Sequence, residues 1–133
     1  MVRAVAQVVL GGALVVAGVS HLTFARDDFR AQVPSWVPLD ADPVVIVSGL
    51  VEIVLGGALL TTWKQPRRAL LGLVAGGFFV AVFPGNVAQL TGHRDAFGLD
   101  TDAKRAIRLL FQPVLIAVAL GATDAWRCPP WRR

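Results

Sequence analysis

Charged residues and cysteine are scarce in this sequence, and tyrosine is absent. Only 17% of the 133 residues are charged, whereas 55% are hydrophobic, and the mean hydropathy is +0.60. This composition argues against an ordinary soluble domain. The single cysteine, Cys128, excludes both a CxxC pair and an intramolecular disulfide. Zinc-ligand spacing, a phosphate-binding glycine loop and a Ser-His-Asp order are also missing, so no metal site and no independent enzyme activity is predicted.

The sequence contains several long stretches without a charged residue. A membrane span needs about 20 mostly apolar residues. Residues 4–24, 43–63 and 69–90 meet this requirement, and residues 106–126 do so if Arg108 enters the membrane. The sequence therefore predicts an all-α, polytopic membrane protein, a bundle of four transmembrane helices that forms a single domain over residues 1–133.

The basic residues are divided unequally between the two sides of this predicted bundle. One side carries Arg3, Lys64, Arg67, Arg68, Arg127, Arg132 and Arg133, and the other carries Arg26, Arg30, Arg94, Lys104 and Arg105. The positive-inside rule then places both termini in the cytoplasm. All four tryptophans fall at or beyond span ends, which suits the headgroup region. The basic residues form no aromatic-interleaved patch, so nucleic acid is not an expected partner; the lipid bilayer is.

The connections between the spans differ in character. Residues 64–67 form a short polar turn, which predicts that the second and third spans are antiparallel neighbours. Residues 25–41 mix apolar side chains with charges and prolines, as expected of a segment lying at the membrane interface. The hexapeptide VLGGAL occurs at both 9–14 and 54–59. Because no long repeat period accompanies it, we interpret these glycines as packing residues, like the Gly72 and Gly76 pair.

Glu52 is the most informative residue, because it is the only charge inside the second predicted span. A carboxylate at a helix centre costs about 2.5 to 3.5 kcal/mol on translocon-derived scales, so it usually faces a protein interior or a cavity. Glu52 shares a helix face with Ser48, Gly49 and Gly56, and small residues mark packing faces in membranes. The side chain of Glu52 is therefore expected to point into the bundle.

Further intramembrane polar residues lie in the same half of the bilayer as Glu52. They are His21, Asn86, Gln89, Arg108 and Gln112. Pro84 and Pro113 border this layer and each removes a helical hydrogen bond, which frees a backbone acceptor. Two interpretations remain open. The residues line a ligand-binding cavity that opens outward, or they form a closed structural network in which Glu52 pairs with Arg108 through Gln112 or Asn86.

Five short motifs in order resemble the DoxX-like family of small bacterial four-helix membrane proteins. They are His21-Leu22, Val33-Pro34 with Pro38, Ser48 to Glu52 (SGLVE), Phe83 to Asn86 (FPGN) and Arg108 to Pro113 (RLLFQP). The resemblance covers nearly the whole chain. It implies a protein of the bacterial cytoplasmic membrane, and some members of that family are connected with quinone-linked sulfur oxidation or redox-defence assemblies.

The combined expectation is a cavity that binds a small amphipathic molecule, with a quinone headgroup as the first candidate cofactor. Glu52 would accept or relay a proton, Arg108 would balance its charge, and His21, Asn86 and Gln112 would bind carbonyl oxygens. The chain would then be an accessory subunit with a membrane or extracytoplasmic redox partner. An assembly factor or scaffold, a homo-oligomer and a small-solute transporter remain alternatives, although the transporter needs a path through inner halves that look almost purely apolar.

Overall fold

The protein is built from helices, as the sequence predicts. The computed structural model describes residues 1–132, and within them it contains no strand and five helices: α1 (Val2–Leu22), α2 (Arg26–Arg30), α3 (Ala41–Thr61), α4 (Arg67–Thr91) and α5 (Asp102–Ala122). All except α2 are long and apolar enough to cross a membrane. The predicted four-helix architecture is confirmed, and each span begins two to four residues before its expected start.

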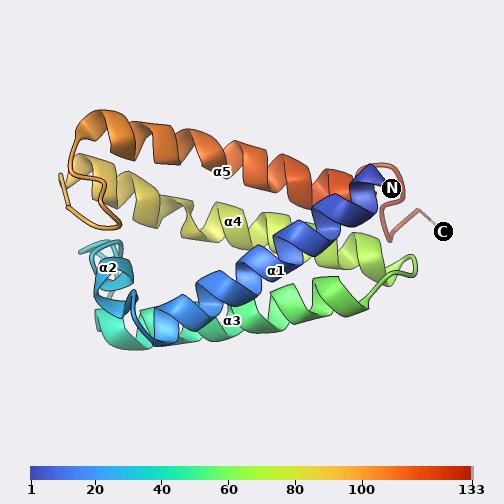
Figure 1. The fold of residues 1–133 in the computed structure, drawn as a ribbon, viewed down its shortest axis with the longest axis horizontal. Coiled ribbons are helices and arrows are strands. Elements are labelled where there is room, and N and C mark those ends of the chain that lie inside the picture. The colour runs from blue at the N-terminus through green and yellow to red at the C-terminus, as the bar shows by residue number, and fades with distance from the viewer. Residues whose placement is uncertain (133) are drawn as a thin grey trace.

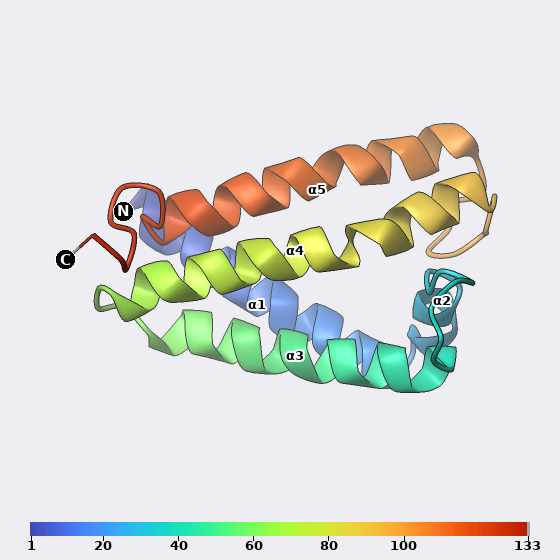
Figure 2. The ribbon, with the colours of Figure 1, turned by 180° about the vertical axis from the view of Figure 1, so that it is seen from behind.

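The four long helices form two closely packed pairs, α1 with α3 and α4 with α5. Figures 1 and 2 show α3 and α4 leaving the short turn at residues 62–66 and diverging toward the opposite end. The second and third spans are therefore antiparallel but touch little, so the neighbour relationship inferred from the short turn is only partly correct. Both termini lie at the end of the bundle that carries this turn, which we call the termini end. The opposite end is the loop end.

Glycine brings α1 and α3 into backbone contact. A Cβ atom added to Gly56 would lie 2.5 Å from the carbonyl oxygen of Gly11, and one added to Gly18 would lie 2.5 Å from that of Gly49. Gly11 and Gly56 occupy the same position in the two VLGGAL copies. The packing interpretation therefore holds for Gly11 and Gly56, which face each other across antiparallel helices, whereas a Cβ on Gly12 or Gly57 would meet nothing within 4 Å.

The α4–α5 pair uses its glycines unequally. A Cβ on Gly72 would lie 1.8 Å from Thr123 Oγ1, whereas the nearest atom to a Cβ on Gly76 is 3.5 Å away, an ordinary van der Waals distance. Only Gly72 of the predicted pair is therefore needed for close approach. Pro84 and Pro113 lie inside continuous helices, although each lacks the N–H of a normal helical residue.

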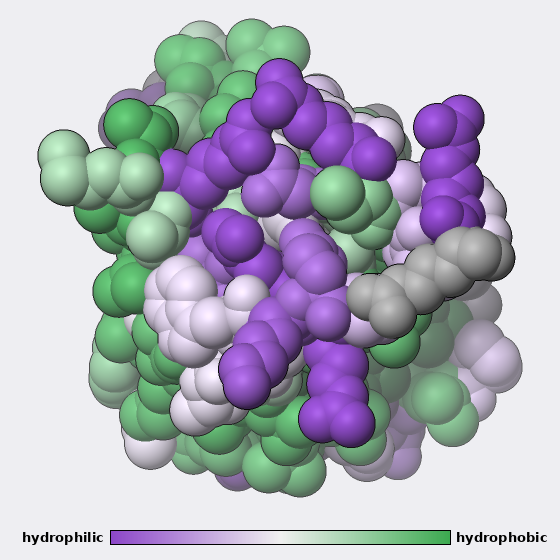
Figure 3. Space-filling model, turned by 90° about the vertical axis from the view of Figure 1, so that its right-hand side faces the viewer, coloured by the Kyte–Doolittle hydropathy of each residue, from purple (hydrophilic) through white to green (hydrophobic). Residues whose placement is uncertain are grey.

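A polar cluster at the termini end ties the helix pairs together. Gln7 is fully buried and donates to Leu59 O at 2.7 Å and to Thr62 O at 3.0 Å. Arg68 donates to Gln7 Oε1 at 2.6 Å and lies 3.7 Å from the carboxylate of Asp124. Figure 3 shows hydrophilic side chains gathered over this end, with hydrophobic ones around them. Gln7 is thus a buried polar side chain in the termini-end half of the bundle, which the sequence predicts to be almost purely apolar.

Candidate functional site

A cavity of about 400 Å³ lies between the two helix pairs toward the loop end. Its walls come from all four long helices and from the connection between α1 and α3. Most of the lining is apolar, with Leu14, Phe29, Val45 and Phe79 among it. We call this space the central cavity. It exists because α3 and α4 diverge, so their facing sides do not close on each other.

His21 and Glu52 form one polar wall of the central cavity. His21 Nε2 lies 3.4 Å from Glu52 Oε2, and both residues are buried. Neither of these two atoms has a hydrogen-bond partner among residues 1–132. The placement follows from packing, because a Cβ on Gly49 would lie 2.7 Å from His21 Cβ, so α3 can approach His21 only where it carries glycine.

The other imidazole nitrogen of His21 indicates where the protons lie. Nδ1 is 3.2 Å from Val45 O and 2.9 Å from Ser48 Oγ, and Ser48 Oγ donates to Val45 O at 3.2 Å. Since a carbonyl can only accept, the arrangement that satisfies all three groups has a proton on Nδ1. Nε2 of a neutral ring is then an acceptor facing a carboxylate oxygen. The facing pair needs one proton, on Glu52 or on His21, to avoid a contact between two acceptors.

Asn86 and Arg108 contribute a second polar wall to the same cavity. Arg108 Nε donates to Asn86 Oδ1 at 3.2 Å, and the guanidinium carbon lies 4.7 Å from the centre of the Phe97 ring. The amide of Gln32 joins them: Nε2 donates to Asn86 Oδ1 at 3.3 Å, and the opposite amide orientation places its oxygen 3.2 Å from Arg108 Nη2. Gln32 and Ser48 were not among the predicted site residues. Ser48 belongs to the motif that contains Glu52, whereas no sequence pattern distinguishes Gln32.

The two glutamines predicted for the site have different positions. Gln112 lines the central cavity and donates to Phe79 O at 3.0 Å. Phe79 precedes Val80, whose carbonyl has no helical donor because Pro84 lacks an N–H. Gln89 is also buried, but it does not line the cavity. It contacts Gln32 at 2.8 Å and donates to Ala96 O at 3.4 Å, so it supports the loops.

The alternative in which Glu52 pairs with Arg108 through Gln112 or Asn86 is not found. Glu52 lies beside His21, whereas Arg108 binds Asn86, and no ion pair joins Glu52 and Arg108 within residues 1–132. The reason is the helix pairing. Glu52 is on α3, which packs on α1, and Arg108 is on α5, which packs on α4, so each polar side chain finds its partner inside its own pair.

The two loop-end connections, residues 23–40 and 92–101, together form a cap over this end. The backbone N–H of Phe97 donates to Asp28 Oδ1 at 3.1 Å, and Arg94 Nη1 donates to the carbonyls of Ala31 and Val33 at 2.8 and 2.7 Å. The Phe29 ring lies between His21, to which it is tilted, and Phe97, which it meets edge to face, with centroid distances of 3.4 and 4.7 Å. The segment predicted to lie at the interface thus contains α2 and reaches the cavity wall.

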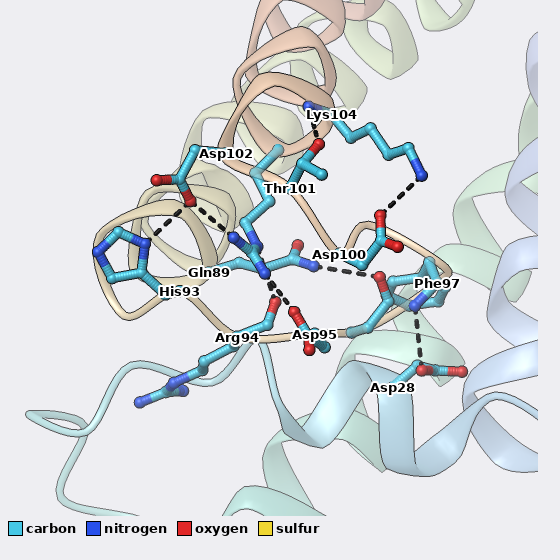
Figure 4. A network of polar contacts seen from close by, with 12 residues as sticks. Asp28, Gln89, His93, Arg94, Asp95, Phe97, Asp100, Thr101, Asp102 and Lys104 are labelled. Atoms are coloured by element: carbon cyan, nitrogen blue, oxygen red, sulfur yellow. Dashed lines mark hydrogen bonds and ion pairs between the residues drawn. The ribbon is translucent and has the colours of Figure 1, made fainter.

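Arg105 anchors the second part of the cap. Its side chain is 4% exposed, pairs with Asp95, donates to Asp102 Oδ1 at 2.6 Å and donates to Arg94 O at 3.1 Å. Figure 4 shows these carboxylates converging, with His93 bound to Asp102 beside them. From the sequence, Arg105 is predicted only to be one of the basic residues at a span end. Its spacing of three from Asp102 is the one sequence signal for the ion pair.

These features define a class of protein: a multi-pass α-helical membrane protein with a polar-walled cavity between its helices. A family model described as a domain of unknown function, DUF8561, matches residues 10–123, and the chain belongs to this family. The matched range contains every residue of both polar walls. No curated protein and no solved structure matches the chain.

Proposed function

We propose that this protein binds a small amphipathic molecule in the central cavity, with a quinone headgroup as the first candidate. The observation that carries the proposal is the pair of unpartnered polar atoms, His21 Nε2 and Glu52 Oε2, at the wall of a largely apolar cavity. Buried polar atoms nearly always have hydrogen-bond partners. A bound molecule that offers a donor or an acceptor at this wall would supply the missing bond.

The shape and chemistry of the cavity favour a ligand with polar groups at two ends. One wall carries His21 and Glu52, and another carries Asn86 and Arg108, while the surfaces between them are apolar. A volume of about 400 Å³ lies within the usual range for small-molecule sites. The two carbonyl oxygens of a quinone lie on opposite sides of an apolar ring, which matches this pattern. The guanidinium would donate to one carbonyl, and the proton of the His21–Glu52 pair would serve the other.

The proposed role is that of an accessory subunit of a redox system rather than an independent enzyme. The resemblance of the SGLVE, FPGN and RLLFQP motifs to the DoxX-like family supports a quinone over other amphipathic molecules. In this proposal the proton carried by Glu52 or by His21 is available to a ligand that gains or loses protons with its electrons. A separate redox partner would carry out the electron transfer.

Glu52→Gln is expected to deplete the bound molecule. Solvent extracts of purified wild-type protein, analysed by mass spectrometry, should contain one quinone or other lipid-like molecule near stoichiometry. Glu52→Gln should lower its amount about tenfold, which corresponds to roughly 1.4 kcal/mol of binding free energy. Asp27→Asn is the matched control, because it neutralises a carboxylate at the same end whose side chain is 97% exposed.

A second variant pair tests the cavity by volume. Ala17→Leu places a larger side chain in the cavity lining, and Ala117→Leu makes the same change at an exposed position of α5 that is not part of the lining. Only Ala17→Leu should lower the amount of bound molecule in the extract. If all variants retain the same bulk lipids at equal folded yield, the polar walls serve only to hold the helices together, and the proposal fails.

We also propose that the protein lies in the bacterial cytoplasmic membrane with both termini in the cytoplasm. Cys128 is the only cysteine and is exposed at the termini end, so it reports the orientation of the unmodified chain. A membrane-impermeant maleimide should label Cys128 only after the cells are permeabilised. In the double variant Cys128→Ser/Ser35→Cys, the new cysteine sits at the loop end and should react in intact cells. The reverse labelling pattern would invert the proposed topology.

A further inference from the structure

A second hollow, of about 440 Å³, lies along α5 beside Arg108. Its apolar walls include Phe97, Ile107, Phe111 and Leu115, and its basic residues are Lys104 and Arg108. We call it the α5 groove. Ile107 and Phe111 are more than half exposed, so the groove faces the surroundings of the bundle and not its interior.

Arg108 is a membrane cation without a counter-ion in the protein. No carboxylate lies within ion-pair distance of it among residues 1–132, and its contacts are the Asn86 amide, the Gln32 amide and the Phe97 ring. Arg105, one turn earlier, has two carboxylate partners. Because an uncompensated charge inside a membrane is costly, the position of Arg108 favours an anion from outside the chain.

Lys104 adds positive charge one turn from Arg108, but its charge is already balanced. Its ammonium group donates to Asp100 Oδ1 at 2.7 Å. This hydrogen bond holds the pKa of the Asp100 carboxyl below its usual range, so Asp100 is ionised at neutral pH. Lys104 is therefore a weaker anion ligand than Arg108, and the proposal relies on Arg108.

The order of residues along α5 matches the order of groups in a phospholipid. Lys104, Arg108 and Leu115 are spaced by four and seven residues and lie on one helix face. Arg108 is about 9 Å from the start of α5 at 1.5 Å per residue, and its side chain leans toward that start, at the headgroup level. The apolar side chains of Phe111 and Leu115 follow toward the membrane centre.

We propose that the α5 groove binds one anionic phospholipid, with its phosphate on Arg108 and an acyl chain along Ile107, Phe111 and Leu115. The charge of Arg108 selects the headgroup, and the apolar wall distinguishes a lipid from a free phosphate. Arg108, Gln112 and Leu115 border both the groove and the central cavity, whereas Ile107 and Phe111 border only the groove. A substitution at Ile107 therefore tests the groove without changing the lining of the cavity.

Native mass spectrometry of delipidated protein tests the proposal, with phosphatidylglycerol and phosphatidylcholine titrated separately. Wild-type protein should bind one phosphatidylglycerol about tenfold more tightly than phosphatidylcholine. Arg108→Gln should abolish this preference, Arg108→Lys should retain part of it, and Lys104→Gln should reduce it less than Arg108→Gln does. Arg67→Gln is the control, because Arg67 is exposed at the termini end.

Ile107→Trp fills the groove without touching the charge, and it covers the case in which Arg108→Gln does not fold. It should lower phosphatidylglycerol binding while the molecule extracted from the central cavity stays at its wild-type amount. Glycerol 3-phosphate, which has the headgroup chemistry but no acyl chain, should not compete at equal concentration. Equal affinity for the two lipids in wild type, or an unchanged preference in Arg108→Gln, would overturn the proposal.

Discussion

Gly56→Ala is expected to destabilise the folded bundle strongly, whereas Gly57→Ala in the next position is not. The new Cβ at position 56 would lie 2.5 Å from Gly11 O and 2.9 Å from Val15 N, both backbone atoms of α1. Backbone cannot move aside as a flexible side chain can, so α1 and α3 would have to separate. Overpacking of this kind costs about 1–3 kcal/mol, and small-residue contacts supply much of the packing between membrane helices.

The measurement is thermal unfolding of the detergent-solubilised protein, followed by circular dichroism. Gly57 has no atom within 4 Å of an added Cβ, so the matched variant makes the same chemical change on the same helix without the collision. Alanine also favours helix over glycine by about 1 kcal/mol, which should make Gly57→Ala neutral or slightly stabilising. Equal losses in both variants would show that helix packing does not depend on this contact.

Arg105→Gln is expected to release the cap. The variant removes the pair with Asp95 and the bond to Arg94 O, which hold residues 92–101 against α5. A hydrogen bond to a charged group contributes about 1.5–3 kcal/mol where water is excluded, and the pair with the exposed Asp95 carboxylate adds less. About 1.4 kcal/mol changes an opening equilibrium tenfold. Amide hydrogen exchange at Phe97, whose N–H is bonded to Asp28, should therefore accelerate at least about tenfold.

The control for this prediction is Arg30→Gln, at the same end of the bundle. Arg30 has carboxylates at 3.5 and 3.8 Å, but its side chain is half exposed, and exposed pairs contribute little. Its removal should leave exchange at Phe97 unchanged. Phe97 has a φ of 55°, a backbone conformation that large side chains rarely adopt, so this segment needs outside support. If amide exchange at Phe97 is unchanged in Arg105→Gln, the segment is held by the contacts of Asp28 and Arg94 and not by Arg105.

The candidate site was predictable where a single residue breaks a pattern. Glu52 interrupts an apolar span, and the structure buries it at a cavity wall as expected. His21, Asn86, Arg108 and Gln112 also line that cavity. The partners of these residues were not predictable. Which side chains meet depends on the rotation of each helix about its axis, and spacing within one helix leaves that rotation undetermined.

Contacts made by the connections between helices were not predictable from the sequence either. The sequence places residues 25–41 at the interface, but it does not indicate that Gln32 and Phe29 reach the cavity. The bond between Asp28 and Phe97 joins residues 69 apart in the chain. Gln7 carried no recognisable pattern, and the spacing of Arg105 from Asp102 did not indicate burial, since a lone polar residue near a span end is compatible with exposure to solvent as well as with burial.

The sequence by itself determined the number of spans, their approximate limits and the presence of one buried carboxylate. These properties follow from the free-energy cost of moving charge and unpaired backbone into a membrane. That cost depends on the residues of each segment and not on its packing partners. Only the tertiary structure decided that α1 pairs with α3 and α4 with α5, that Glu52 meets His21 and not Arg108, and that a cavity remains between the pairs. Those outcomes depend on glycine contacts and hydrogen bonds between segments far apart in the chain, whose geometry exists only once the helices have packed.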